Sequence, residues 1–311
     1  MYMHSKYKFT VFTSCYNSEK FIRRLYSSLK KQKFMNFEWL VVDDFSQDGT
    51  KKILESLKKE APFDMRILYN TSNEMISFCC NLGVKNAQGQ FFIFLDHDDE
   101  LLPHSLERFN EVWENIKSDK KPKLAGMMSN CMDQYGNFVT DELPNSPCIT
   151  DYYSMYYDME VKGEKFFCYL TKVLQENNFS TVDRYVPENV LLLNISDSYD
   201  TYFFNENLRI YHINQENHMS LINKLADGWK IKFPIGMRYA KLQDLNRRSR
   251  KMLKNPLLFF KTIVNYARFS FHADIPIHKS LSEINSTTLK ILIIIFIPIA
   301  KLLSIKDSYL N

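Results

Sequence analysis

This 311-residue sequence lacks several features that would point to familiar classes of protein. Lysine and arginine number 40 against 36 acidic residues, so the formal net charge is only +4. So small an excess gives no general attraction for the phosphates of a nucleic acid, and we expect no nucleic-acid partner. The sequence also has no internal repeat and no low-complexity segment. Its composition is that of a globular protein long enough for one large domain and an appendage.

The six cysteines lack the paired spacing of a zinc site, and the N-terminus lacks the apolar core of a secretory signal. We therefore expect reduced, mostly buried cysteines and a cytoplasmic protein. Near the C-terminus, the apolar run at residues 291–300 is far shorter than the roughly 18 residues that a spanning helix needs. The sequence thus predicts that this run does not cross a membrane.

What the sequence does contain is a regular alternation of strand and helix patterns over its first third. Strand patterns fall at residues 9–14, 37–42, 65–69 and 91–95, with helical patterns at 19–32, 50–59, 76–87 and 105–117. This order predicts an α/β fold with a mostly parallel, Rossmann-like sheet flanked by helices. Beyond it the sequence becomes richer in strand patterns and aromatic residues, with a hairpin signal at residues 133–137.

We divide the chain into three parts: residues 1–120 and 121–236, two halves of one domain, and residues 237–311, a C-terminal helical extension. In the extension a basic cluster and interleaved aromatic residues precede the apolar run. This pattern favours a peripheral anchor that lies in the plane of a membrane surface. A tail packed on the domain, or on a second subunit of an oligomer, stays open because length alone does not separate these cases.

A cluster of carboxylates directly follows the fourth strand pattern, in the sequence LDHDDE at residues 95–100. Ligands of open α/β sheets bind beyond the carboxyl ends of the strands. Carboxylate oxygens suit Mg²⁺ or Mn²⁺, and a Mg²⁺ held by one or two carboxylates typically completes its shell with substrate phosphates. On this motif alone, a solvated turn with Asp98 or Asp99 capping the next helix stays open.

Two more polar loops follow strand patterns. The segments FTVFTSCYN (residues 9–17), VVDDFSQDGT (residues 41–50) and LDHDDE resemble, in order and spacing, the signature segments of inverting family 2 glycosyltransferases with the GT-A fold. The likeness covers about the first third of the chain. Three motifs in the right order are far more specific than any one of them.

The resemblance implies a nucleotide-diphosphate sugar donor, usually UDP-linked, and a divalent metal, Mn²⁺ or Mg²⁺. Residues 1–120 would bind the donor, and residues 121–236 would bind a glycan or lipid-linked acceptor. The implied donor-binding residues are Ser14, Tyr16, Asn17, Asp44, Asn73 and Asp96, and the implied metal ligands are Asp96 and Asp98. Asp44 would contact the uracil ring. With the anchor, this implies assembly of a bacterial surface polysaccharide at the inner face of the cell membrane.

One departure from the family lies at residues 73–83, where members commonly carry a glycine and then a basic residue near the donor. This chain has no Lys or Arg there, so charge compensation for the diphosphate must come from the metal or elsewhere. Two acids in the second loop have simpler interpretations. Asp43 orders the loop as a strand-end acid, and Asp48 caps a turn or helix.

An inverting transfer needs a base near the acceptor hydroxyl. We expect Glu188 in this role, because it follows Pro187 at a predicted helix start, where family members of this type place an acid. Stabilisation of the helix dipole is the alternative for Glu188, and Asp183 is the reserve base.

Three histidines lie near these motifs. Related transferases often have a histidine reaching the metal or diphosphate near the position of His212 and His218, although packing or solvent exposure is the simpler interpretation for both. His97 should alternate away from the acids, so we do not count it as a ligand.

Two other functions are weighed against glycosyl transfer. A sugar-nucleotide-binding protein without activity stays open because of the altered loop at residues 73–83. A receiver-like signalling domain is disfavoured: its acidic pair should follow the first strand and its single Asp the third, whereas here the acids follow the second and fourth.

Overall fold

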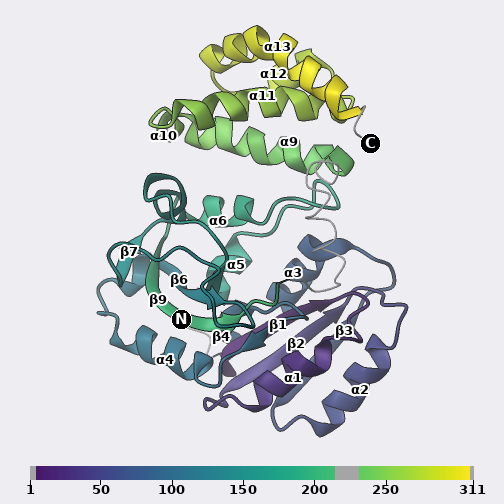
Figure 1. Cartoon of the computed structure of the whole chain (residues 1–311), viewed down its shortest axis with the longest axis vertical. Helices are drawn as coiled ribbons and strands as arrows, with labels where there is room; N and C mark the ends of the chain where they lie inside the picture. The colour runs from purple at the N-terminus through teal and green to yellow at the C-terminus, as the bar shows by residue number, and fades with distance from the viewer. Residues whose placement is uncertain (1–4, 214–230, 309–311) are drawn as a thin grey trace. The chain divides into compact units, whose positions relative to one another are not determined.

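The computed structural model describes residues 5–213 and 231–308, which fall into two compact units. The first, which we call the sheet unit, contains residues 1–178 and 191–215. The second, the helical unit, contains residues 179–190 and 216–311. Figure 1 shows both along the colour scale of the chain. The segment Phe179–Val190 thus belongs with the C-terminal helices, although it lies in the middle of the sequence.

Among the described residues, the sheet unit holds a nine-stranded sheet of order β3-β2-β1-β4-β8-β6-β9-β5, with β7 paired to β9. The strands are β1 (Tyr7–Cys15), β2 (Phe37–Asp43), β3 (Asp64–Tyr69), β4 (Gly89–Phe94), β5 (Glu100–Leu101), β6 (Leu124–Met132), β7 (Cys148–Thr150), β8 (Lys165–Leu170) and β9 (Asp200–Ile210). Strands β1 to β4 are parallel, which confirms the predicted parallel half. Strand β8 runs antiparallel to β4 and β6, so the second half is mixed.

The parallel strands are buried because helices cover the sheet. Strand β2 is buried at every position, and its acid Glu38 is paired with Arg66 (Nε to Oε2, 2.7 Å). The helices of the first part are α1 (Ile22–Lys30), α2 (Thr50–Glu60), α3 (Met75–Asn86) and α4 (Ser105–Asn115). Each lies within a few residues of its predicted span. Helix α1 begins later than expected because a turn, closed by the Phe21 N–H on the Ser18 carbonyl, precedes it.

The strand order changes direction at β1: β2 and β3 follow on one side of it, and β4 lies on the other side. In open α/β sheets, this switch point places the ligand crevice at the carboxyl ends of the two diverging strands. The Leu95 N–H donates to the Phe12 carbonyl over 2.9 Å and keeps the ends of β4 and β1 together. The first and third motif loops therefore start side by side.

The rest of the sheet unit agrees with the sequence in two further respects. Asp133 forms the predicted turn by accepting the N–H groups of Tyr135 and Asn137. All six cysteines are free, and all but Cys148 are buried. Two short helices, α5 (Thr171–Glu176) and α6 (Asn189–Ile195), complete the described helices around this sheet.

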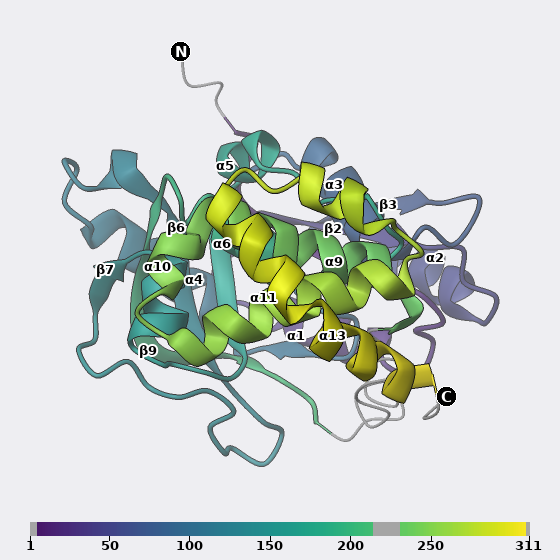
Figure 2. The ribbon, with the colours of Figure 1, turned by 90° about the horizontal axis from the view of Figure 1, so that it is seen from above.

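The helical unit is formed by α9 (Pro234–Gln243), α10 (Ser249–Met252), α11 (Pro256–His272), α12 (Ile277–Ser282) and α13 (Thr287–Ser308). Within this unit α11 lies between α9 and α13 (Figure 1), and α13 runs over α11 (Figure 2). The segment Phe179–Val190 is held to α9, because Val186 and Val190 pack on Ala240.

The structure corrects one prediction about the apolar run at residues 291–300. This run lies inside the 22-residue helix α13, which accommodates Pro298. By length and composition alone, Thr287–Asp307 could cross a membrane, with a mean hydropathy of 2.2. The prediction that the segment is too short to span was wrong because the residues on both sides of the run continue the helix.

Candidate active site

The first two motif loops are tied together by their backbones and by Asn17. The Asp44 N–H donates to the Cys15 carbonyl over 2.8 Å. The Asn17 N–H donates to Ser46 Oγ over 2.9 Å, and the Asn17 Oδ1 accepts the Gln47 N–H over 2.8 Å. Asn17 has a φ of +51°, a left-handed conformation that Asn tolerates better than most residues. The two loops therefore form one platform at the edge of the sheet.

Asp44 lies at the centre of this platform, with 3% of its surface exposed. Its Oδ1 accepts from Asn70 Nδ2 (2.7 Å) and the Glu74 N–H (2.9 Å), and its Oδ2 accepts from the Met75 N–H (2.8 Å). Two of these donors are backbone groups at the start of α3, where a negative charge is stabilised. A carboxylate offers about four acceptor sites, so the described donors leave room for one more on Oδ2.

The other two acids of the second loop organise the backbone. Asp43 accepts from Ser46 Oγ over 2.5 Å, and burial raises the pKa of Asp43. Asp48 accepts the N–H groups of Thr50 (3.0 Å) and Glu19 (3.2 Å). These contacts agree with the loop-ordering roles that the sequence predicts for Asp43 and Asp48.

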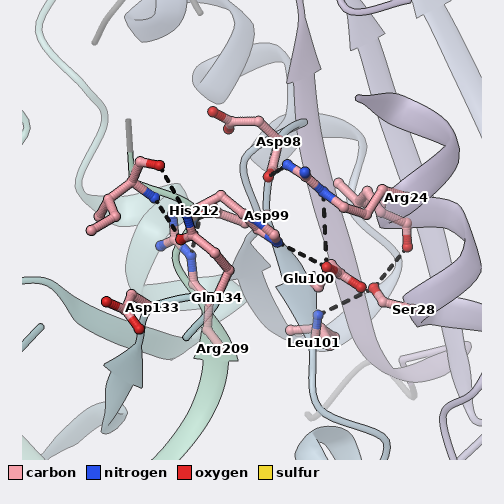
Figure 3. Close-up of polar contacts among 12 residues, drawn as sticks. Arg24, Ser28, Asp98, Asp99, Glu100, Leu101, Asp133, Gln134, Arg209 and His212 are labelled. Carbon is pink, nitrogen blue, oxygen red and sulfur yellow. Dashed lines mark hydrogen bonds and ion pairs between the residues drawn. The ribbon is translucent and has the colours of Figure 1, made fainter. Parts of the chain in front are cut away.

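Arg209 of β9 organises the third loop (Figure 3). Its guanidinium is almost fully buried and donates from Nε to Asp99 Oδ2 (2.7 Å) and from Nη2 to Asp96 Oδ2 (2.5 Å), while Nη1 lies 3.4 Å from Glu164 Oε1. Burial works to lower the pKa of Arg209, but Asp99, Asp96 and Glu164 raise it well above its usual value. The cluster therefore holds a permanent cation among three acids.

A second set of contacts reaches the same loop from α1. Arg24 donates to the backbone carbonyl of Asp98, and its Nε lies 3.8 Å from Glu100 Oε1. Glu100 also forms a 2.8 Å hydrogen bond with His212 Nε2, and the His212 N–H donates to Asp99. Figure 3 shows Arg24, Glu100 and His212 around the loop. His212 thus supports the loop, in line with its packing interpretation.

The structure describes only one of the other two histidines. The ring of His97 lies 6.2 Å from that of Phe21 (centroid to centroid). His218 lies outside the described residues.

Asp96 and Asp98 differ in exposure. The Asp96 side chain is 57% exposed, whereas Asp98 is 7% exposed. Within residues 5–213 and 231–308, no group of three or more His, Cys, Asp or Glu side chains could hold a metal ion. The pair nevertheless fits a divalent ion that takes one or two carboxylates and completes its shell with substrate phosphates.

The remaining predicted donor residues lie on the same edge. Tyr16 is exposed, Ser14 is half-buried at the end of β1, and Asn73 is half-buried just before α3. The structure therefore places Ser14, Tyr16, Asn17, Asp44, Asn73, Asp96 and Asp98 in the loops at the carboxyl ends of β1, β2, β3 and β4.

Glu188 directly precedes α6 and lies in the segment that belongs to the helical unit, whereas the three loops belong to the sheet unit. Burial raises the pKa of Tyr185, and the charge of Glu188 raises it further. Asp183 Oδ2 accepts the Gly236 N–H over 2.9 Å and so caps the first turn of α9. Asp183 therefore has a structural role, which the sequence did not reveal.

Sequence reasoning missed Arg209, Arg24 and Glu164. A charged residue between Leu208 and Ile210, two aliphatic residues at the end of a strand, is the local signal for Arg209, because a buried charge needs partners. Its acidic partners at Asp96 and Asp99 are more than 100 residues away in sequence, and no local pattern links them.

The fold and this site define a glycosyltransferase of the GT-A type. A similar fold occurs in residues 1–349 of TarS from Staphylococcus aureus, solved in complex with UDP-GlcNAc (TM-score 0.61, 18% identity, covering 96% of this chain and 89% of that one). A mannosyltransferase from Pyrobaculum calidifontis, solved with GDP-Man and Mn²⁺, is also similar (TM-score 0.52, 13% identity, covering 99% and 86%).

Sequence comparison agrees. The model of the family Glycosyl transferase family 2 matches residues 10–119. The chain is 25% identical to the GalNAc(5)-diNAcBac-PP-undecaprenol beta-1,3-glucosyltransferase of Campylobacter jejuni, covering 94% of both chains. It is 37% identical over 102 residues to the poly(ribitol-phosphate) beta-N-acetylglucosaminyltransferase TarS of S. aureus, covering 32% of this chain and 18% of TarS. The family model thus covers about a third of the chain, and the comparisons together identify this chain as a glycosyltransferase.

Proposed function

We propose that this enzyme transfers a sugar, with inversion, from a UDP-sugar to a hydroxyl of a lipid-linked or polymeric glycan in bacterial surface polysaccharide synthesis. The observation that carries the proposal is the joining of three strand-end loops around Asp44, Asp96 and Asp98 at the switch point of the sheet. The names of the similar proteins from C. jejuni and S. aureus support both acceptor classes.

Asp44 supports a uracil base. Its remaining acceptor site on Oδ2 suits a donor N–H, and the N3 of uracil carries a hydrogen whereas the N3 of neutral cytosine does not. The other acceptor sites are taken by Asn70, Glu74 and Met75, so the carboxylate is fixed in position before the nucleotide binds. A preorganised acceptor of this kind favours UDP over CDP.

Asp98 and Asp96 would hold a divalent metal, Mn²⁺ or Mg²⁺, together with the donor diphosphate. Bound there, the ion would neutralise the diphosphate as it leaves. Two arginines contact this loop, and both already have acceptors. Arg209 donates to Asp99 and Asp96, and Arg24 donates to the Asp98 carbonyl near Glu100. This arrangement supports a metal as the source of the positive charge that residues 73–83 do not supply.

Glu188 would take the proton from the acceptor hydroxyl. Its place at the start of α6 supports this role, and the engagement of Asp183 with Gly236 leaves the reserve candidate occupied. We further propose peripheral attachment to the cytoplasmic face of the membrane, where a lipid-linked acceptor is found. The proposal leaves the oligomeric state open.

A thermal-shift screen of nucleotides and nucleotide sugars, with and without Mn²⁺, tests the donor assignment. Ligands of the native state raise the unfolding temperature, and saturation to 100 times Kd adds about 2.7 kcal/mol. We expect UDP and UDP-sugars to stabilise the protein when Mn²⁺ is present, and CDP to do so much less. Equal stabilisation by CDP would contradict the role of Asp44. UDP-sugar binding without transfer to any acceptor would favour the non-catalytic alternative.

A further inference from the structure

Helix α13 carries an apolar surface that points away from its own unit. Six of its exposed side chains are large and aliphatic: Ile291, Ile294, Ile295, Ile299, Leu302 and Ile305. At about 100° per residue these six side chains and Pro298 lie on one side of the helix. We call these six side chains the α13 apolar face. A helix at the surface of a soluble protein normally exposes polar residues, whereas α13 exposes a row of apolar ones.

The opposite side of α13 forms the contacts that hold this helix in its unit. Leu289, Ile293 and Ala300 are buried, and α13 packs along α11 (Figure 2). The rings of Phe260 and Phe296 lie 5.4 Å apart (centroid to centroid) across these two helices. The α13 apolar face is therefore surplus to the packing of α13 on α11.

An ion cluster fixes which side of α13 faces outward. The Arg268 guanidinium donates to both oxygens of Asp307, at 2.6 Å and 2.5 Å, and His272 Nε2 lies 2.8 Å from Asp307 Oδ2. All three side chains lie between α11 and the C-terminal end of α13. Rotation of α13 to bury its apolar face would break this cluster, so the outward orientation is built into the unit.

The same cluster argues against a spanning orientation. Helix α13 is long and apolar enough to span a membrane. The side of α13 opposite its apolar face is covered only while α13 stays packed on α11. Insertion of the pair across a bilayer would carry Lys261, Arg268 and Asp307 with it. Charged groups in the hydrocarbon are costly, whereas a helix lying flat keeps them in water.

The charges on the outer surface fit an anionic partner. Helix α13 contains three lysines and one acid, and the acid, Asp307, is buried in the ion cluster. At about 100° per residue, Lys290 and Lys301 fall along one border of the α13 apolar face and Lys306 toward the other. At the start of α11, the exposed Leu257 and Phe260 lie close in sequence to the exposed Lys254 and Lys261. Lysines around an apolar face match anionic headgroups around acyl chains.

We propose that the α13 apolar face inserts into the surface of an anionic lipid bilayer, with α13 parallel to the membrane plane. The inference extends the proposed function by naming the attachment surface, but it does not depend on the donor or acceptor. Because Phe179–Val190 packs on α9, the whole chain must be used to test it.

The test is co-sedimentation of the whole chain with vesicles of phosphatidylglycerol and phosphatidylcholine. We expect the wild type to pellet with them, less at high salt but not to zero, because salt screens lysines and leaves apolar insertion intact. The double variant Ile295→Gln, Leu302→Gln removes two side chains that are 60% and 68% exposed, so it should fold normally and lose most binding. Met35→Gln, a 44% exposed control in the sheet unit, should bind as the wild type does.

The variants Ile291→Trp and Leu302→Trp report the orientation of α13. Lipids brominated at different depths quench the added tryptophan, and the signal of the wild type is subtracted. Equal, shallow depths support the in-plane helix, and clearly different depths would show a spanning helix and overturn the proposal. Unchanged pelleting of the double variant would also overturn it. So would a wild-type dimer that the double variant dissociates, because the α13 apolar face would then be a protein interface. UDP binding in the same samples reports separately on the proposed function.

Discussion

The two units of this protein differ in the kinds of side chain that they expose. The sheet unit buries aromatic and aliphatic strands and gathers its acids at one edge. The helical unit buries arginines, among them Arg238 and Arg248, while it exposes the isoleucines of α13. The pattern of the sheet unit is typical of a domain that is surrounded by water and binds a polar ligand. The pattern of the helical unit is expected when part of the surface meets a less polar medium.

One buried arginine of the helical unit, Arg238, has several hydrogen-bond partners. Arg238 Nε donates to Ser270 Oγ (2.9 Å), and its Nη2 donates to Tyr266 Oη (2.8 Å) and Glu283 Oε2 (2.7 Å). A satisfied polar network specifies one packing of helices, whereas a half-satisfied one is costly. This network therefore helps to fix the packing of the helical unit, while part of the aliphatic surface of α13 stays exposed.

The largest expected effect comes from Glu188, the proposed base, which belongs to the helical unit. Glu188→Gln should lower turnover by about 10² to 10⁴, the usual contribution of a positioned base, while UDP binding stays intact. Steady-state kinetics and calorimetry measure the two. Asp183→Asn is the matched control and should change stability through α9 more than turnover. Near-normal turnover of Glu188→Gln would assign the base to another acid.

The buried cation of the sheet unit should matter more for stability than an exposed one. Arg209→Met leaves Asp99 buried without its partner, which costs about 3–5 kcal/mol. Arg108→Met removes an exposed pair with Glu206 and should cost about 1 kcal/mol or less. Urea denaturation of both variants gives the comparison. Similar losses would contradict the assignment of Arg209 as the organiser of the third loop.

The ion cluster of the helical unit gives a smaller, pH-dependent effect. Burial alone would raise the pKa of Asp307, but the bonds from Arg268 and His272 outweigh it and lower the pKa below 3.8. A carboxyl with a depressed folded-state pKa contributes stability above its unfolded pKa and loses it as the pH falls through the folded value. Asp307→Asn should therefore cost about 1–3 kcal/mol at pH 7 and progressively less below about pH 4. A pH-independent difference would contradict the cluster.

The parts that sequence reasoning predicted are those governed by local patterns. Periodicity located the first four strands and helices, and the strand-end positions located Asp44, Asp96 and Asp98. The parts it missed depend on contacts between distant segments. Arg209 contacts Asp99, which lies 110 residues away in the sequence. Phe179–Val190 packs on α9, which begins only at Pro234. The length of α13 was missed because the helix extends beyond the apolar run at residues 291–300 on both sides.

The central claim is that Asp98 helps to hold the metal and diphosphate of a UDP-sugar, and calorimetry of UDP with Mn²⁺ tests it most directly. The wild type should bind UDP more tightly with Mn²⁺ than without it. Asp98→Asn should lose most of this metal-dependent affinity, because the diphosphate charge would be left uncompensated. Glu206→Gln, an exposed acid on β9, is the control and should bind normally. Unchanged UDP affinity of Asp98→Asn in the presence of Mn²⁺ would contradict the account.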